Sequence, residues 1–247
     1  MSEVKSMSDA PKVRGAIPRE KEKKGEIKFI TVANRGTREQ LELLTAMKNI
    51  VSRHLPNMAL DYISRIVYDT VYHESLLLIN CKDNKPFGGI CFRPFPTQGF
   101  VEIVFCAVDS TQQVQGFGSY LMQHLKKEIQ SRGIYHILTY ADNQAIGYFM
   151  KQGFHKHVTL NKERWQGYIK DYVEATLMEC VLHKNVEDYT DVPSTIKKQR
   201  DALQSLIGQV SKSEVRPGLT CFKQGIPKIK IEEIPGLKET GWKPDVH

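Results

Sequence analysis

The sequence predicts a mixed α/β fold in which helices flank a mostly antiparallel central sheet. Three apolar runs, at 75–81, 87–95 and 99–108, are separated by short turn-forming segments, as in an antiparallel meander. The third run continues through a glycine-containing loop into an amphipathic helix that begins at Gly116. A further strand, a helix and two more strands follow, so we expect one sheet that is covered by helices.

The chain before the meander divides into a charged arm, a strand and two helices. Residues 1–24 contain seven basic and four acidic side chains, and we expect them to form a flexible basic arm. A strand is predicted at 27–32. Thr37 and Gln40 match a capping box, and the apolar spacing after them predicts a helix that ends near His54. A second short helix has an apolar face made of Leu60, Ile63 and Val67.

The chain after the meander first alternates helices with strands and then changes in character. The expected elements are helices at 116–133 and 143–152, and strands at 134–140, 155–160 and 175–182. They complete a domain at 25–184. Residues 185–247 are expected to hold one helix, at 193–210, and then an irregular connector with isolated prolines and glycines.

The composition argues against several classes of protein. The net charge is +7, but no basic stripe is interleaved with aromatic residues, so we expect no direct contact with nucleic acid. No apolar run approaches the roughly 20 residues of a membrane span, and the polar N-terminus has no secretion signal. The five cysteines are widely spaced and the eight histidines show no metal-ligand spacing. This pattern indicates reduced thiols in an intracellular protein without a metal site.

The loop before the helix has the composition of an anion site. Residues 113–119 read QVQGFGS. They lack the Gly-Lys-Ser/Thr of a P-loop and the three-glycine spacing of the dinucleotide fingerprint. Two interpretations stay open, a turn that packs a helix on a strand and a pyrophosphate held by main-chain N–H groups. In the second, glycine is needed because a Cβ atom would hold the phosphate away.

Several motifs, in the same order, resemble the catalytic domain of the GNAT-superfamily histone acetyltransferases, the PCAF-like subunits of SAGA-type complexes. They are VEIVFCAV, QVQGFG, LTYADNQAIGYFMKQGF and GYIKDYVEATLMEC, with PTQGF before the central strand. The resemblance covers about 25–182 and makes 25–184 the acetyltransferase domain. It continues in VRPGL and IPGLKETGW, which resemble the connector that precedes a bromodomain. Because no bromodomain follows, we expect a fragment or a shortened form.

The resemblance implies a GNAT fold, whose central sheet is splayed to admit the co-substrate acetyl-CoA. It places the pantetheine along Cys106, Ala107 and Val108. The pyrophosphate would lie on the amides of Gln113, Val114, Gln115, Gly116, Phe117, Gly118 and Ser119. The other side would be flanked by a helix with Gln144, Ala145, Ile146 and Gly147. The family usually has tyrosine at the position of Gln144, so we expect one contact with the co-substrate to be lost.

Glu102 is the acidic residue in the central strand, and from the residues alone two interpretations of it are open. A carboxylate there can reach water or pair with an arginine. Lysine acetylation instead needs a base, because the ammonium form of lysine is not nucleophilic. The resemblance places the family's catalytic glutamate on Glu102. We therefore expect it to accept a proton, through a water molecule, while the amine attacks acetyl-CoA directly in a ternary complex.

Cys106 has two possible roles in this chemistry. Period-two alternation places it on the same face of the strand as Glu102, Phe100 and Val104. Its backbone N–H is expected to stabilise the oxyanion. An acetyl-cysteine intermediate is disfavoured, because no histidine lies in the neighbouring sequence to activate the thiol.

No general acid is assigned. Many members of the superfamily carry a tyrosine at the position of Phe149, and the neighbouring Tyr148 is expected to point elsewhere. Coenzyme A thiolate is a tolerable leaving group, so a dedicated acid is not required.

Three aromatic residues, Trp165, Tyr168 and Tyr172, gather in ERWQGYIKDY. Either the loop packs on its own aromatic side chains or, as the resemblance favours, it forms one wall of a cleft for an extended peptide. We therefore predict a nuclear histone lysine acetyltransferase that binds a histone tail peptide and the adaptor subunits of a SAGA-like complex. The alternatives are a non-catalytic acetyl-CoA-binding scaffold and an acetyltransferase for small-molecule amines.

Overall fold

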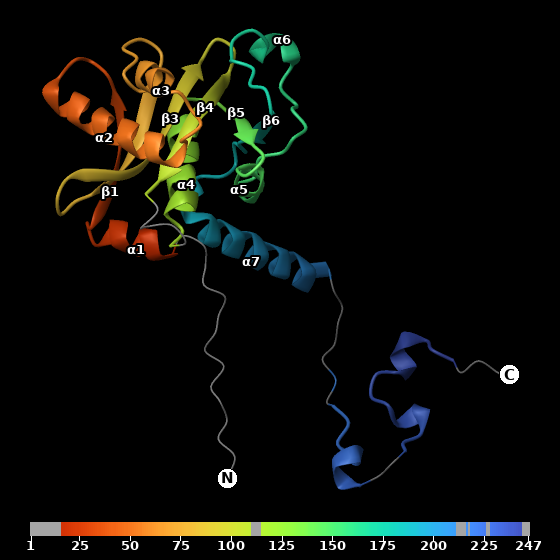
Figure 1. Ribbon diagram of the computed structural model, residues 1–247. Coiled ribbons are helices and arrows are strands. Elements are labelled where there is room, and N and C mark those ends of the chain that lie inside the picture. Colours follow the sequence, from red (N-terminus) through yellow and green to blue (C-terminus); the bar gives the residue numbers. More distant parts are fainter. Residues whose placement is uncertain (1–15, 110–114, 211–215, 217, 226–227, 244–247) are drawn as a thin grey trace. The chain divides into compact units, whose positions relative to one another are not determined.

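A six-stranded sheet forms the centre of the first of two compact units in this chain (Figure 1). The computed structural model describes residues 16–109, 115–210, 216, 218–225 and 228–243. The two units are Met1–Thr195 and Ile196–His247. The strands lie in sequence order: β1 (Ile27–Ala33), β2 (Glu74–Asn80), β3 (Lys85–Phe95), β4 (Phe100–Val108), β5 (His136–Asp142) and β6 (Ala175–Val181). Neighbours run antiparallel except for β4 and β5, which run parallel, so the predicted fold class is confirmed.

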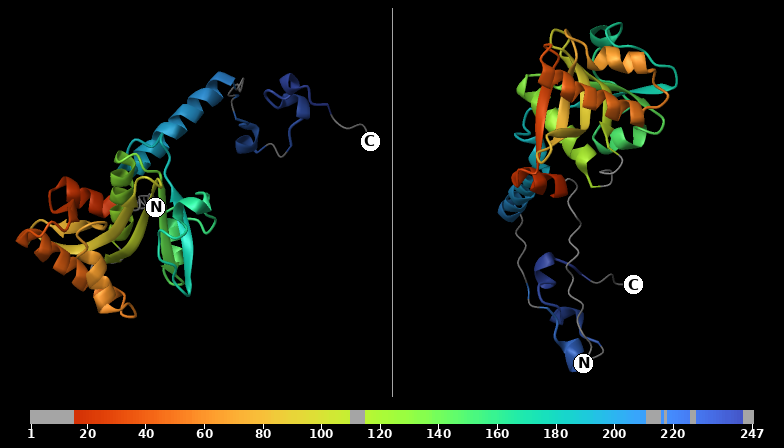
Figure 2. Two further views of the ribbon diagram at one scale, coloured as in Figure 1. Left: turned by 90° about the horizontal axis from the view of Figure 1, so that it is seen from above. Right: turned by 60° about the vertical axis from the view of Figure 1, so that its left-hand side comes forward.

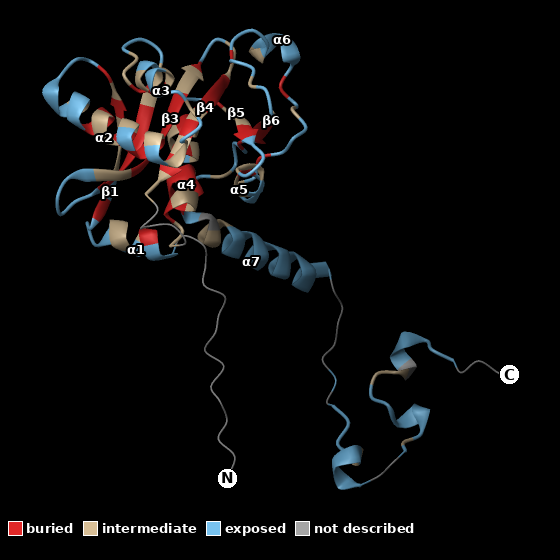
Figure 3. Ribbon diagram, viewed as in Figure 1, coloured by how far each residue is buried: buried red, intermediate tan, exposed pale blue. Residues whose placement is uncertain are grey.

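Helices cover both faces of this sheet (Figure 2). They are α2 (Arg38–His54) and α3 (Leu60–Val67) on one face, and α4 (Phe117–Ser131) and α5 (Ile146–Lys151) on the other. Met47 and Ile63 are fully buried in the first core, and Leu125 and Phe149 are buried in the second. Buried residues therefore gather on the strands and on the helix sides that face them (Figure 3).

Helix α2 begins as predicted, and its Met47 side chain packs directly on the backbone of β3. Thr37 Oγ1 accepts a hydrogen bond from the backbone N–H of Gln40 at 3.3 Å, which is half of the expected capping box. The Gln40 side chain instead accepts from the N–H of Arg35 at 2.9 Å. Under α2, a Cβ atom on Gly89 would lie 2.6 Å from Met47 Sδ. Glycine at position 89 therefore sets how closely the helix can pack.

Residues 16–23 form helix α1 (Ala16–Lys23), so the prediction of a flexible arm is wrong for this part of the chain. Pro18 lies in the first turn, where it costs no helical hydrogen bond, and it is buried. The Arg19 guanidinium donates to the carbonyl oxygen of Thr190. Such tertiary contacts stabilise this helix, although its polar composition alone predicts a flexible segment. The rest of the predicted arm, 1–15, lies outside the described residues.

The segment 155–160 does not form the predicted strand. Only His155 pairs with Glu179 of β6, through two backbone hydrogen bonds of 2.8 and 2.9 Å. The N–H groups of Thr159 and Leu160 donate to the buried Glu179 carboxylate at 2.5 and 3.2 Å, and Thr159 Oγ1 adds a third bond at 2.8 Å. Because a side chain takes these amides, the segment is a loop held on β6.

The helix predicted at 143–152 begins later and is shorter. Asp142 Oδ1 accepts hydrogen bonds from the N–H groups of Gln144 and Ala145 at 2.9 and 2.7 Å. An aspartate that bonds the backbone two and three residues ahead closes a turn, which delays the helix to Ile146. A further helix of only four residues, α6 (Lys162–Trp165), follows in the loop before β6.

The chain after β6 carries a 3₁₀ turn, η2 (Tyr189–Asp191), and then α7 (Val192–Val210). Tyr189 is buried in the core beside α4, so the first unit extends beyond the predicted limit at residue 184. The helix predicted at 193–210 is confirmed. The second unit also holds three 3₁₀ turns: η3 (Cys221–Gln224), η4 (Ile231–Glu233) and η5 (Lys238–Thr240). Among the described residues, no helix combines the length and apolar character that crossing a membrane requires.

Replacing Glu179 by alanine tests the anchoring of the 155–160 loop. The change leaves the amides of Thr159 and Leu160 without their acceptor, so we expect a loss of about 2 to 4 kcal/mol in the free energy of unfolding. Denaturant unfolding at neutral pH measures it, with Glu163→Ala on the exposed surface of α6 as the control. A loss no larger than that of the control would contradict the anchoring.

Candidate functional site

Strand β4 is the centre of the candidate site, because its two edges are paired over different lengths. It pairs with β3 along its length, but with β5 only from Phe100 to Ile103. The N–H of Asp109 donates to the carbonyl oxygen of Phe87 at 2.7 Å. Backbone N–H groups alternate between the two edges of a strand, so the N–H of Ala107 faces β3 and the N–H of Cys106 faces away from it. The N–H of Cys106 therefore faces the side on which β5 has parted from β4. This parting is the splay that the sequence led us to expect.

A β-bulge in β4 changes which side chains share a face. Cys91 of β3 lies opposite Phe105 and Phe92 lies opposite Ile103, so Val104 is an extra residue without a partner in the register. As a result, Glu102 and Cys106 point to opposite faces of the sheet. The prediction that they share a face is wrong, because simple alternation does not allow for the extra residue.

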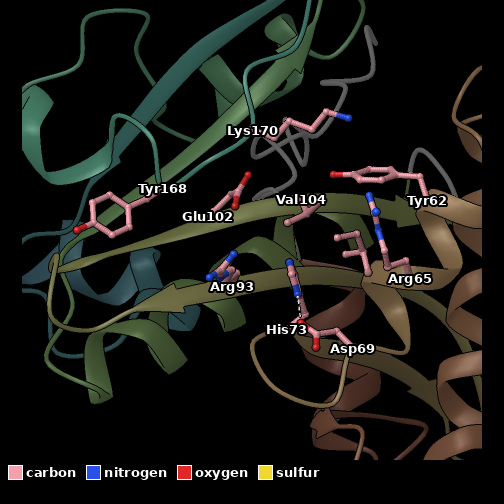
Figure 4. A pocket seen from close by; sticks show the side chains of 10 residues that line it. Tyr62, Arg65, Asp69, His73, Arg93, Glu102, Val104, Tyr168 and Lys170 are labelled. Carbon is pink, nitrogen blue, oxygen red and sulfur yellow. Dashed lines mark hydrogen bonds and ion pairs between the residues drawn. The ribbon is translucent and has the colours of Figure 1, made fainter.

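Glu102 lies in a cavity of about 400 Å³ on the face that carries α3 (Figure 4). Only 6% of the residue is exposed. Tyr62 and Arg65 of α3 line the cavity on one side, and the Tyr62 hydroxyl points toward Glu102. The remaining polar and aromatic lining residues are Asp69, His73, Arg93, Tyr168 and Lys170. His73 Nδ1 lies 2.5 Å from Asp69 Oδ2, so these two side chains form a pair at the edge of the cavity.

The surroundings of Glu102 bring the pKa of its carboxyl close to neutral pH. Burial raises the pKa of the carboxyl to about 7, and the positive charge of Arg93 opposes this rise. Arg93 is the register partner of Glu102 on β3. Its guanidinium is held over the rings of Tyr72 and Phe95, 4.4 and 4.5 Å from their centroids. A carboxyl with this pKa can both accept and release a proton near pH 7.

The three aromatic residues predicted to form a peptide-binding wall have different surroundings. Tyr168 lines the cavity and is 46% exposed. The Tyr172 hydroxyl is hydrogen-bonded to that of Tyr62, so it lies at the edge of the cavity. Trp165 packs against the small core around Phe100, and its indole N–H donates to the carbonyl oxygen of Leu160 at 3.2 Å. The structure thus brings Tyr168 and Tyr172 to the site, whereas Trp165 holds the loop in place.

The glycine loop leads into α4 at the open edge of β4. Gly116 is the N-cap of α4 with φ = +88°, a conformation that favours glycine. Phe117 is buried and meets the ring of Phe87 edge-on at 5.2 Å. First-turn amides such as those of Gly118 and Ser119 have no partner within the helix, so they can bind an anion. Gln113 and Val114 of the predicted set lie outside the described residues.

Gly118 differs from Gly116, because packing against the described residues does not demand a glycine there. A Cβ atom at 118 would meet Tyr148 at 3.5 Å and Val108 at 3.9 Å, which are ordinary contacts. A methyl group at this position therefore fits between α4, α5 and β4. In the turn before α5 and its first residues, Gln144 and Gly147 are exposed, while Ala145 and Ile146 pack on the core.

Tyr148 connects the elements around this edge, and the prediction that it points elsewhere is wrong. Its hydroxyl donates to the carbonyl oxygen of Gly118 at 2.9 Å and lies 3.8 Å from Cys106 Sγ. One side chain of α5 thus contacts both α4 and β4. Burial raises the pKa of the Cys106 thiol to about 11, so this cysteine is protonated near neutral pH.

Comparisons with known proteins agree with this geometry. Residues 44–154 match the Acetyltransferase (GNAT) family. A crystal structure of Tetrahymena GCN5 is 47% identical, has a TM-score of 0.62 and covers 65% of this chain and 99% of that chain. The chain belongs to the GNAT acetyltransferase family. The catalytic domain of Tetrahymena GCN5 in complex with coenzyme A is also similar, with 46% identity, a TM-score of 0.55 and coverage of 67% of this chain and 98% of that chain.

Curated GNAT relatives extend the match beyond the catalytic domain. The histone acetyltransferase GCN5 of Oryza sativa subsp. japonica is 45% identical over 91% of this chain and 44% of its own length. The protein of the same name from Yarrowia lipolytica is 44% identical over 95% of this chain and 50% of its own length. This GNAT chain thus spans about half the length of the curated relatives that it matches.

Titration of Glu102 tests the electrostatics of the GNAT site directly. In Arg93→Gln the opposing positive charge is gone, so we expect the pKa of Glu102 to rise above its value of about 7. Carboxyl carbon NMR measures this pKa in the wild type, in Arg93→Gln and in the charge-conserving Arg93→Lys. Arg38→Gln, at an exposed ion pair with Glu42, is the control that should change nothing. A Glu102 pKa that is identical in Arg93→Gln and the wild type would contradict the assigned role.

Proposed function

We propose that this chain transfers the acetyl group of acetyl-CoA to the side chain of a lysine in a histone tail. The observation that carries the proposal is the Glu102 carboxyl, which is buried in a cavity and has a pKa of about 7. Glu102 lies on β4, and the edge of β4 that β5 leaves unpaired lies beside the first residues of α4. Family membership supports acetyl transfer, and the GCN5 relatives are named as histone acetyltransferases.

Acetyl-CoA would bind along the open edge of β4. The amides of Phe117, Gly118 and Ser119 would take the pyrophosphate, and the predicted set adds Gln113 to Gly116. The pantetheine would follow Cys106, Ala107 and Val108. On its other side would lie Gln144, Ala145, Ile146 and Gly147, in the turn before α5 and its first residues. This arrangement would lead the thioester toward Cys106.

The acceptor lysine would enter from the cavity that holds Glu102. At neutral pH the amine is almost fully protonated, so the carboxylate of Glu102 takes a proton, through a water molecule, before the amine attacks. The amine nitrogen forms a bond to the thioester carbon, and the negative charge on the carbonyl oxygen meets the N–H of Cys106. Collapse of this intermediate re-forms the carbonyl, breaks the carbon–sulfur bond and releases coenzyme A as a thiolate. The nitrogen gives up its remaining extra proton to water, and the thiolate can take a proton from water.

The bulge at Val104 suits this direct transfer. It sends the Glu102 side chain into the acceptor cavity, while the N–H of Cys106 faces the open edge. A base and an oxyanion donor on one strand can thus act on two molecules that arrive from different sides. The Cys106 thiol points away from Glu102 and has a raised pKa, which speaks against an acetyl-cysteine intermediate.

We also infer a nuclear location, because the proposed acceptor is chromatin. Binding to the adaptor subunits of a SAGA-like complex is proposed on the resemblance of the catalytic motifs to that family.

Replacing Glu102 by glutamine tests the proposed base. Loss of a general base typically costs 10²- to 10⁴-fold, so at pH 7.5 we expect at least about a hundredfold fall in kcat with a histone tail peptide. In the wild type, kcat/KM should rise with pH through about 7 as Glu102 loses its proton, and this rise should be absent in the variant. Binding of coenzyme A, measured by calorimetry, should be unchanged. Activity within tenfold of the wild type at neutral and alkaline pH would refute the mechanism.

Gly118→Ala separates ligand binding from folding. The added methyl group has room in the protein and replaces glycine in a helix, so stability should stay equal or increase slightly. A Cβ atom beside the proposed pyrophosphate-binding amides would hold the phosphate away from them, so we expect the KM for acetyl-CoA to rise about tenfold or more. Thermal unfolding and steady-state kinetics measure the two effects. Gly208→Ala in α7 is the matched control, with open space around it. An unchanged KM for acetyl-CoA in Gly118→Ala would exclude the loop as the pyrophosphate site.

A further inference from the structure

Helix α1 is attached to the first half of α4 by a small group of polar and aromatic side chains. Glu22 Oε2 accepts a hydrogen bond from the Tyr120 hydroxyl at 2.5 Å and lies 3.2 Å from His124 Nε2. One residue earlier, Lys21 Nζ lies 5.6 Å from the ring centroid of Phe117. These contacts reach the first residue of α4 and the two turns that follow it.

The contact is built into the protein rather than lying loosely on its surface. Tyr120 is only 2% exposed. The His124 ring stacks on the Phe29 ring of β1, with 3.7 Å between centroids and 12° between planes. The Tyr120 ring meets the Phe29 ring edge-on, with 5.5 Å between centroids. Glu22 thus closes a cluster whose other members are already held by β1 and α4. Hydrogen bonds that are partly buried in this way restrict where the side chains and the two helices can lie.

The position of this cluster along α4 gives it a consequence for ligand binding. The main-chain amides of Phe117, Gly118 and Ser119 form the proposed pyrophosphate site. Tyr120 is the next residue along α4, and His124 lies about one turn after it. A set of amides binds an anion well only if each is held within a fraction of an ångström of its place. Whatever fixes the first two turns of α4 therefore also fixes these donors.

We propose that α1 is a positioning element of the acetyl-CoA site, in which Glu22 acts through Tyr120 and His124 to hold the first turns of α4. The inference rests on the proposed function for the identity of the ligand, and it adds to it a part of the chain that makes no contact with the reacting atoms. Glu22 is a positioning residue, and the group that responds to it is the pyrophosphate of coenzyme A.

The experiment compares two variants, each of which removes a side-chain contact at one end of α4. Glu22→Ala removes the acceptor at the first turns. Glu74→Ala is the matched control, because it removes the partner that Arg132 binds at 2.7 Å beyond the last turn of the same helix. Calorimetry gives the Kd for coenzyme A, kinetics give KM for acetyl-CoA and for the peptide separately, and thermal unfolding gives the Tm of each variant.

We expect Glu22→Ala to raise both the Kd for coenzyme A and the KM for acetyl-CoA about three- to tenfold, with the KM for the peptide unchanged. Glu22→Gln, which keeps an acceptor for Tyr120, should restore most of the affinity. Glu74→Ala should lower the Tm without weakening coenzyme A binding. Should Glu22→Ala fail to fold, Tyr120→Phe carries the same comparison.

Two results would overturn the inference. One is a coenzyme A Kd for Glu22→Ala within twofold of the wild type. The other is an equal loss of affinity in Glu74→Ala, because the effect would then be a general loss of stability. A wild-type chain that does not bind coenzyme A would instead contradict the proposed function itself, so the two failures can be told apart.

Discussion

The site depends on how briefly β4 and β5 pair. Parallel neighbours hold each other through their main-chain groups, and here that contact ends at Ile103, five residues before β4 does. The remaining part of β4 is supported by β3 alone, so its other edge can offer main-chain donors to a ligand without breaking the sheet. The glycine loop before α4 and the side chain of Tyr148 border the same edge. The proposed binding of acetyl-CoA requires this opening.

The second constraint is the charge of a carboxyl group inside the protein. Because burial raises the pKa of Glu102 to about 7, the folded protein holds this proton more tightly than the unfolded chain does. The resulting loss of stability is absent below the unfolded pKa of about 4.3, grows up to about pH 7 and is complete above it. A residue that weakens the fold at working pH is typical of an active site. Arg93, held over Tyr72 and Phe95, limits this cost without closing the cavity.

The sequence was informative wherever a single pattern decides a feature. The apolar period of α4 and the short turns of the meander each predict an element that the structure confirms. Alternation could not reveal the extra residue at Val104, which turns Cys106 away from Glu102. Composition could not show that Glu179 would take the amides of a predicted strand. Sequence patterns do not reveal Arg93 and Tyr62 as site residues, because they reach the site only through strand register and helix packing, although both lie inside predicted elements.

The most direct test of the opening in the sheet is residue-resolved hydrogen exchange of the β4 amides, with and without coenzyme A. The N–H of Cys106 faces the open edge, whereas that of Ala107 faces β3. We predict that coenzyme A slows exchange at Cys106 substantially and leaves the already protected Ala107 nearly unchanged. Exchange at Cys106 that stays the same in saturating coenzyme A would contradict the placement of the ligand along this edge.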